Sequence, residues 1–245
     1  MQPAFFCPKE GDAVGKRYAL LLDAGFVKRK IKRDLGDVTP SNIERLVASI
    51  RKHEAVSGFE LHRIYYYDAA PLGRSVDHPL TGESIEYGST EVFNENAALL
   101  KEVAKLPHFA LRKGECTHDG WSAQFKKLKR SSARFDADTN TLQVRPVDLK
   151  PVIRQKGVDM RIGMDIAALT LKKHVDVIAM VTADSDFVPA MKFARREGAQ
   201  LHLFTLAHGV KEEMSENCDL LISASARSLV DLLPADPLAT SQPTC

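Results

Sequence analysis

Two aspartates follow a strongly apolar stretch in the second half of the chain. Residues 177–189 read VIAMVTADSDFVP. This pattern predicts a buried strand that ends before Asp184 and Asp186, and a helix that begins after them. In open α/β sheets, ligands bind in the crevice outside the carboxyl ends of the strands. Carboxylates there suit a hard divalent cation, so the segment predicts a metal site.

A second apolar stretch, near the start of the chain, ends in an acid in the same way. Residues 18–23 read YALLLD, so Asp23 closes a predicted buried strand. In a parallel sheet, Asp23 and Asp184 would lie at one edge. Asp159 precedes the helix that leads into the later strand, and Asp165 lies within that helix about a turn and a half further on. Both could lean over the same edge.

Several carboxylates at one edge would repel one another strongly unless a cation lies among them. Mg²⁺ or Mn²⁺ would relieve that repulsion and activate water for hydrolysis of a phosphodiester. Asp159 and Asp186 have a simpler explanation, because either could act only as the N-cap of its helix. Asp165 is open to both interpretations. Asp23 and Asp184 follow fully apolar strands, where an acid gains nothing from packing, so metal ligation is the better explanation for them.

The elements that must position these acids alternate between strands and helices. Right-handed crossovers between such strands give a mainly parallel sheet with helices on both faces, an α/β fold. Thr39 and Pro40 predict the start of the first long helix, as its N-cap and first helical residue. Between residues 114 and 156 the periodicity is lost, and we expect a partly β insertion there. Strands are predicted at residues 18–23, 59–67, 109–112, 175–182 and 200–206, and helices at 39–53, 94–106, 159–173, 187–197 and 224–233.

The 245 residues, 44% of them hydrophobic, can support one domain with a sizeable core. We expect this domain to span residues 17–233, between an N-terminal extension at 1–16 and a flexible tail at 234–245. No apolar run approaches the roughly twenty residues of a membrane span. The first residues also lack the apolar core of a signal peptide, so we expect a cytoplasmic protein. The four scattered cysteines form no zinc-binding pattern.

Three motifs, taken together and in this order, resemble the NYN domain family, specifically its LabA-like branch among the PIN-like nucleases. The resemblance spans most of residues 18–206, and residues 73–149 fit it loosely. It implies a three-layer α/β/α fold of the PIN type and a ribonuclease that depends on Mg²⁺ or Mn²⁺. One departure is Phe26, where many NYN domains carry Asn, and it puts one polar contact in doubt. The motifs are LLDAGF at residues 21–26, QKGVDMRIGMDIAAL at 155–169 and VTADSDFVPAMKFARREGAQL at 181–201.

The resemblance also implies which acids work in the site. Asp23 corresponds to the metal ligand of the first strand, and Asp159 to the acid of the KGVD element. Asp184 and Asp186 correspond to the acids of the DSDF element. These four are the implied catalytic residues. Asp165 matches an acid on the helix before the last motif, which makes it the fifth implied metal ligand.

Basic residues flank these motifs. Lys28, Arg29 and Lys30 follow the first predicted strand, and Arg154 and Lys156 lead into the KGVD element. Such groups beside a metal site would supply sequence-independent affinity for a nucleic-acid backbone, although an ordinary charged surface is the alternative. The net charge of +2 is too small to decide between them. We expect single-stranded or flexible RNA as the partner, and a homodimer is left open. Another cluster is Lys126, Lys127, Lys129 and Arg130.

The leading functional hypothesis is a metal-dependent endoribonuclease, which hydrolyses RNA phosphodiester bonds with metal-activated water. A phosphatase of the haloacid dehalogenase type also ends its first strand in a catalytic Asp. That chemistry needs a second Asp where this chain has Gly25, so we set it aside. The stronger alternative is a non-catalytic or weakly catalytic RNA-binding regulatory module of the same fold.

Overall fold

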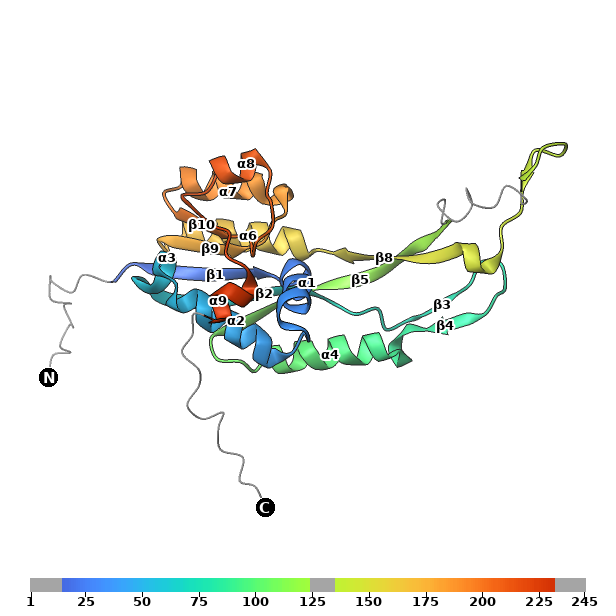
Figure 1. Ribbon diagram of the computed structural model, residues 1–245, viewed down its shortest axis with the longest axis horizontal. Helices are drawn as coiled ribbons and strands as arrows, with labels where there is room; N and C mark the ends of the chain where they lie inside the picture. Colours follow the sequence, from blue (N-terminus) through green and yellow to red (C-terminus); the bar gives the residue numbers. More distant parts are fainter. Residues whose placement is uncertain (1–14, 124–134, 232–245) are drawn as a thin grey trace, which may run out of the picture.

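A seven-stranded sheet forms the centre of the computed structural model, which describes residues 15–123 and 135–231. Its strands are β1 (Arg17–Asp23), β2 (Glu60–Ala70), β5 (Phe109–Ala123), β8 (Leu149–Lys156), β9 (Val177–Val181), β10 (Gln200–Phe204) and β11 (Leu220–Ile222). They lie in the order β11-β10-β9-β1-β2-β5-β8, and all neighbours are parallel except β5 and β8. The predicted α/β fold with a mainly parallel sheet is therefore confirmed (Figure 1).

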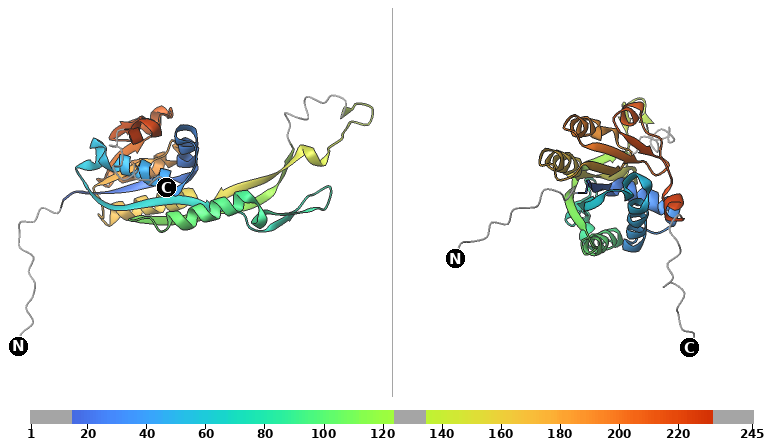
Figure 2. Two further views of the ribbon diagram at one scale, coloured as in Figure 1. Left: turned by 60° about the horizontal axis from the view of Figure 1, so that its bottom comes forward. Right: turned by 90° about the vertical axis from the view of Figure 1, so that its left-hand side faces the viewer.

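Helices cover both faces of the sheet. They are α1 (Ala24–Leu35), α2 (Pro40–Lys52), α3 (Glu54–Ser57), α4 (Glu91–Val103), α6 (Val158–Leu171), α7 (Val188–Arg196), α8 (Glu212–Glu216) and α9 (Ala226–Asp231). Alternate strand residues supply two cores: in β1, Leu20 and Leu22 belong to one, and Ala19 and Leu21 to the other. Helices α1 to α4 and α9 cover the first core, and α6 to α8 cover the second. The result is the expected three-layer α/β/α arrangement (Figure 2).

Local sequence signals explain where several elements begin and end. Thr39 caps α2 by accepting a hydrogen bond from the Asn42 backbone N–H at 3.1 Å, and Pro40 is the first helical residue, as predicted. Gly198 follows α7 with a φ of 93°, a left-handed conformation that glycine adopts without strain. The structure adds α1 directly after β1, and α8 and β11 between β10 and α9, which the sequence pattern did not indicate.

The predicted short strand at residues 109–112 is wrong in its length, because β5 continues to Ala123. The outer part of β5 pairs with β8 in an antiparallel ribbon. This part reads ECTHDGWSA and contains an irregularity between His118 and Trp121, where Gly120 has a φ of 88°. Its residues are exposed or half-buried, so the ribbon has no fully buried face and its sequence shows no clear apolar alternation.

This ribbon belongs to a projection, which we call the arm, made of residues 73–89, 115–123 and 135–156. A hairpin of β3 (Ser75–Asp77) and β4 (Ser84–Glu86) and the short helix η1 (Tyr87–Ser89) lie alongside the ribbon, next to α4 (Figures 1 and 2). The carboxyl ends of β1 and β9 face the arm (Figure 1). The arm also carries β6 (Phe135–Asp136), β7 (Thr141–Leu142) and the short helix η3 (Pro146–Asp148).

Some predictions fall outside the described residues. They are the extension before residue 15, the tail at 234–245 and the basic cluster of Lys126, Lys127, Lys129 and Arg130. Within residues 15–123 and 135–231, no helix is both long and apolar enough to cross a bilayer.

Candidate metal and RNA site

Asp23 lies where β1 ends and α1 begins, at the carboxyl edge of the sheet. Its Oδ1 accepts a hydrogen bond from the Phe26 backbone N–H at 3.2 Å, and its Oδ2 accepts one from Thr182 Oγ1 at 3.0 Å. Burial raises the pKa of the Asp23 carboxyl, and the nearby charge of Asp159 adds to that rise. The two hydrogen bonds and the positive charge of Arg29 oppose it. Asp23 is therefore a fixed carboxylate whose charge the protein alone does not fully stabilise.

Strand β9 brings Asp184 and Asp186 to the same edge. Thr182, the residue after β9, links Asp184 to Asp23: its hydroxyl donates to Asp23 and accepts from the Asp184 backbone N–H at 3.2 Å. Asp184 caps the short helix η4 (Ser185–Phe187) by accepting from the Asp186 N–H at 3.0 Å. The capping role considered for Asp186 thus belongs to Asp184. The Asp186 carboxylate is exposed and makes no hydrogen bond or ion pair with a described residue.

Asp159 lies in the first turn of α6, which begins directly after β8. The N-cap of this helix is Gly157, with a φ of 77°, so Asp159 is not the cap either. The negative charges of Asp184 and Asp186 raise the pKa of Asp159, after burial, which is the largest cause. The charge of Asp159 thus interacts with those of Asp23, Asp184 and Asp186, and we call these four residues the acid cluster. None of the four makes an ion pair with a Lys or Arg in the part of the chain that the structure describes.

The chemistry of the acid cluster fits a hard divalent cation, because all its donors are carboxylate oxygens. The side chains in their present rotamers do not yet converge: among the described residues, no group of three His, Cys, Asp or Glu side chains is placed to hold a metal ion. Mutual repulsion keeps ionised carboxylates apart when no cation lies between them. Asp159 and Asp186 are exposed, and no described residue bonds to their carboxylates, so the side chains can rotate toward an ion.

The structure does not bring Asp165 into the acid cluster. Its Oδ2 accepts hydrogen bonds from Tyr67 Oη at 3.0 Å and from Arg112 Nε at 2.9 Å, and its Oδ1 accepts one from Arg112 Nη2 at 3.3 Å. Both oxygens of Asp165 are therefore engaged in holding α6 against β2 and β5. The resemblance placed Asp165 correctly on the helix before β9. It did not indicate the hydrogen-bond partners of Asp165, which lie on β2 and β5, far away in the sequence.

We expect Asp165→Ala to destabilise the fold and to leave metal binding nearly unchanged. The variant leaves the Tyr67 hydroxyl and the Arg112 guanidinium without their acceptor, a loss of about 1–2 kcal/mol in unfolding free energy because Arg112 is half exposed. Urea unfolding measures the first effect, and Mn²⁺ titration of the folded variant measures the second. A weakening of Mn²⁺ binding by tenfold or more would place Asp165 among the ligands.

Two of the predicted basic residues have structural partners. Lys28 Nζ donates to both oxygens of the buried Asp68 carboxylate, at 3.1 and 2.8 Å, and to Asn96 Oδ1 at 3.4 Å. Lys30 is only 6% exposed, and its ammonium lies 5.3 Å from the centre of the Phe26 ring. The structure therefore does not present Lys30 to a ligand, and it gives Lys28 a role in joining α1 to β2 and α4.

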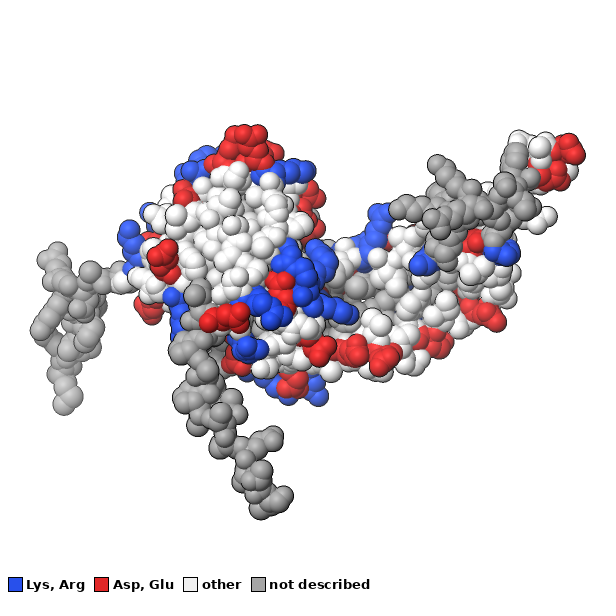
Figure 3. Space-filling model, viewed as in Figure 1, with Lys and Arg blue, Asp and Glu red and all other residues white. Residues whose placement is uncertain are grey.

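Other basic residues stay accessible near the acid cluster. Lys and Arg side chains gather where the body meets the arm (Figure 3). Arg29 is exposed on α1, and its charge reaches Asp23. Lys156 and Arg154 of β8 lie 2.9 and 3.8 Å from the Asp119 carboxylate, but both are more than half exposed. Exposed pairs of this kind are weak, so these cations remain free to meet phosphates.

Three contributors to the site were not singled out from the sequence. Thr182 joins two acids, and its hydroxyl directly before Ala183-Asp184 was the available signal. Lys211 donates to Ser185 Oγ at 2.9 Å and so adds a cation beside the DSDF element. Gln155 lies beside Asp23 because β8 ends at this edge, and β8 itself could not be predicted from its polar sequence.

Comparison with known proteins gives one extensive match and several partial ones. The NYN domain family matches this chain over residues 19–229. A curated relative, an uncharacterized protein of Methanocaldococcus jannaschii, is 27% identical over 82 residues, and the match covers 34% of this chain and 34% of the relative's own length.

Two solved structures show weaker similarity. A Vibrio parahaemolyticus protein of unknown function has a TM-score of 0.47 at 12% identity, over 86% of this chain and 94% of that chain. A structure described for the mechanism and regulation of Sir2 enzymes has a TM-score of 0.38 at 9% identity, over 89% and 90% of the two chains. Scores this low do not establish a shared fold.

The family match includes the carboxyl edge of the sheet, with Asp23, Asp159, Asp184 and Asp186 all inside its bounds. It also spans every strand of the central sheet except the first two residues of β1. The LabA-like branch stays a prediction, whereas the family itself is confirmed. The chain belongs to the NYN domain family, a family of PIN-like nucleases.

Proposed function

We propose that the protein is a Mg²⁺- or Mn²⁺-dependent endoribonuclease and that the acid cluster is its metal site. The observation that carries this proposal is the gathering, at one sheet edge, of four carboxylates from three separate segments, none of them ion-paired with a described residue. A fold gains no stability from such repulsion, so a cation is the natural partner. When bound, a divalent ion supplies the positive charge that activates water and offsets the charge developing on a phosphodiester.

The four acids would hold the metal ion in two different ways. Asp23 and Asp184 are held in place by Thr182 and by backbone N–H groups, so they form the fixed side of the metal site. The Asp159 and Asp186 carboxylates have no hydrogen-bond or ion-pair partner among residues 15–123 and 135–231, and they form the adjustable side. Fixed ligands position the ion with little loss of entropy on binding, while adjustable ones let the site close around it.

Accessible cations close to the acid cluster support RNA as the substrate. Arg29 is exposed on α1, Lys156 and Arg154 are exposed on β8, and Lys211 contacts Ser185, between two of the acids in sequence. Such residues bind phosphates without regard to sequence and orient the strand across the metal site. Asp159, Asp184 and Asp186 are exposed, and Asp23 is half-buried, at the edge of the sheet that faces the arm, where a single strand can reach them. We propose single-stranded RNA for that reason.

The test is cleavage of a fluorescent single-stranded RNA with Mn²⁺, with Mg²⁺ and with EDTA. We expect cleavage only with metal, and a loss of about 10²-fold or more in Asp184→Asn, since a metal ligand supports several kcal/mol of transition-state stabilisation. The exposed arm acid Asp138 provides the matched control, Asp138→Asn, which should cleave as the wild type does. Activity that survives in Asp184→Asn would remove this site. RNA binding without any cleavage would favour the regulatory module.

A further inference from the structure

A cavity of about 340 Å³ opens beside the acid cluster, between α4 and the base of the arm. Its walls come from the end of β2, from η1 and α4, and from the facing strands β5 and β8. Two aromatic rings, Tyr87 and Phe93, and several aliphatic side chains make it mainly apolar. A mostly apolar pocket with a few convergent polar groups is the usual form of a small-ligand site. The polar groups here are Lys28, Asp68, Thr90, Asn96, Cys116 and Gln155.

Gln155 connects this cavity to Asp23. Gln155 and Cys116 are cross-strand partners on β8 and β5, and both line the cavity. Gln155 Oε1 and Asp23 Oδ1 lie 3.9 and 3.4 Å from one point, the place where a Cβ on Gly25 would be. Arg29 Nη1 lies 3.8 Å from that same point. Gln155 is therefore a lining residue of the cavity whose side chain also comes close to Asp23 and to the exposed Arg29.

The walls of the cavity are held in place before any ligand arrives. Phe93 packs so closely on Gly73 that a Cβ there would lie 3.0 Å from its ring, and a Cβ on Gly88 would lie 2.7 Å from the Gly73 carbonyl oxygen. Thr90 caps α4 by accepting from the Phe93 N–H at 3.2 Å. The ion pair of Lys28 with Asp68, which is 1% exposed, secures the opposite wall. Binding in a preformed cavity avoids most of the entropy cost of ordering its walls.

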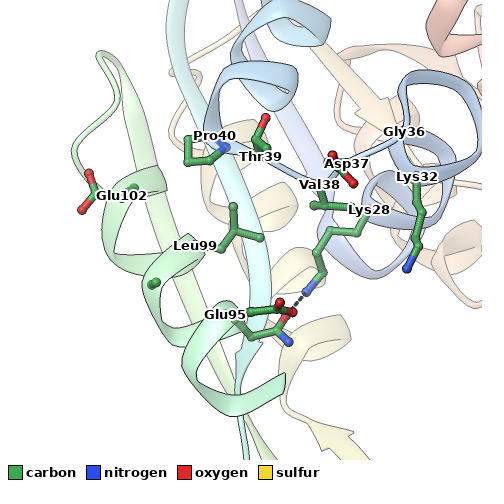
Figure 4. A pocket seen from close by; sticks show the side chains of 12 residues that line it. Lys28, Lys32, Gly36, Asp37, Val38, Thr39, Pro40, Glu95, Leu99 and Glu102 are labelled. Carbon is green, nitrogen blue, oxygen red and sulfur yellow. Dashed lines mark hydrogen bonds between the residues drawn. The ribbon is translucent and has the colours of Figure 1, made fainter. Parts of the chain in front are cut away.

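A second cavity, of about 620 Å³, lies on the other side of Lys28 and Asn96. Figure 4 shows Lys28 reaching across it toward α4, with Glu95 and Glu102 on that helix. Asp37 adds a third acid to its rim. Lys28 and Lys32 are the cations among its lining residues, so the three acids outnumber them. The smaller cavity has one acid, Asp68, which is paired with Lys28, so its charges repel a phosphate chain less.

We propose that the smaller cavity, the base pocket, holds one nucleobase of the RNA whose neighbouring phosphate lies at Asp23, an inference that rests on the proposed function. The rings of Tyr87 and Phe93 supply stacking surfaces, which bind any base. The Gln155 side-chain amide makes no hydrogen bond to a described residue, and it offers a donor and an acceptor to the edge of the base. One base is thus held beside the cleavage site, and the cleaved bond is fixed relative to it.

The test is an abasic scan of a short single-stranded RNA, in which one nucleotide at a time lacks its base. Affinity is measured by fluorescence anisotropy in EDTA, so that no cleavage takes place. We expect an abasic nucleotide at one position to weaken binding about tenfold, the usual value of one base–aromatic stack. In Phe93→Leu and in Gln155→Ala, that penalty should shrink to about threefold or less, because the base has lost part of its pocket.

A matched control is Phe193→Leu, the same change on α7, where Phe193 lines neither cavity. It should keep the full tenfold penalty. Thermal unfolding verifies that each variant is folded, and Gln155→Ala changes only an exposed side chain. Cleavage of the same RNA with Mn²⁺ is measured in parallel.

The outcomes separate the two proposals. A penalty at one position that is lost in Phe93→Leu and kept in Phe193→Leu supports the base pocket, even if the wild type fails to cleave, which would refute the nuclease alone. A flat abasic scan, an unchanged penalty in Phe93→Leu, or no RNA binding at all would overturn the base pocket. If the abasic scan is flat or the penalty is unchanged in Phe93→Leu, the nuclease proposal still stands, provided that the wild type cleaves RNA and Asp184→Asn does not.

Discussion

We expect Asp23→Asn to abolish RNA cleavage and, in metal-free buffer at neutral pH, to make the protein more stable. The amide can accept from the Phe26 N–H and donate to Thr182 Oγ1, so both contacts of Asp23 survive. The variant removes a buried negative charge that lies near Asp159. Cleavage should fall by about 10²-fold or more. The melting temperature should rise by about 2–4 °C for each kcal/mol of repulsion relieved.

The pH dependence of this stabilisation has a definite sign. Folding raises the pKa of Asp23 above its ordinary value of 3.8, so the folded protein binds the proton more tightly than the unfolded chain does. Wild-type stability therefore falls as the pH rises from the unfolded pKa through the folded one, and the loss is complete above it. Asparagine does not titrate. The gain in stability of Asp23→Asn over the wild type should be absent at low pH. It should grow between the unfolded and the folded pKa of Asp23 and stay constant above them.

Differential scanning fluorimetry of both proteins in EDTA, from pH 4 to pH 8, measures this difference. The control Asp138→Asn should follow the wild type throughout, because Asp138 is an exposed acid of the arm. Excess Mn²⁺ should reverse the order of stability, since it binds only the native wild-type site. A variant that is less stable than the wild type at pH 8 without metal would show that Asp23 serves the fold rather than an ion.

The second large effect is expected from Gly114→Ala. A Cβ on Gly114 would lie 2.4 Å from the Lys156 carbonyl oxygen and 2.8 Å from Val158 Cγ2. The first of these is a backbone atom, so it cannot rotate away and β8 must shift where it enters α6. Overpacking of this kind costs about 2–3 kcal/mol, which lowers the melting temperature by about 5–10 °C. Cleavage should fall tenfold or more, because Asp159 follows directly.

Gly163→Ala is the matched control for this prediction. A Cβ on Gly163 meets nothing within 4 Å, and the residue lies inside α6. Alanine is the better helix former, so this variant should be slightly more stable and fully active. Thermal unfolding and single-turnover cleavage compare the two variants. Equal stability of Gly114→Ala and Gly163→Ala would mean that the junction of β5, β8 and α6 is loosely packed.

The sequence predicted the parts of the fold that bury apolar residues at a regular spacing. Residues 18–23 and 177–182 alternate between two cores, so both strands, and the acids that follow them, could be placed at one edge. Thr39 and Pro40 marked a helix start because capping depends only on local chemistry. Each of these signals lies within a few residues of the element that it specifies.

The parts that could not be predicted depend on partners far along the chain. Whether Asp165 faces the metal site or Arg112 is decided by packing across three elements. Lys30 reads as a surface cation in the sequence, yet its side chain packs over Phe26. The ribbon of β5 and β8 satisfies its backbone hydrogen bonds by pairing, and its residues are exposed or only half-buried, so its sequence lacks a clear apolar periodicity.

The ribbon of β5 and β8 leaves the body and returns to it at the same place. Glu115 and Lys156 are paired residues, so the chain comes back to the sheet directly beside the point where it departed. If β5 were joined there to α6 by a short turn, β5, α6 and β9 would still form an ordinary crossover unit. The ribbon is therefore a modular insertion. Its length can change without altering the order in which the chain brings Asp23, Asp159 and Asp184 to one edge.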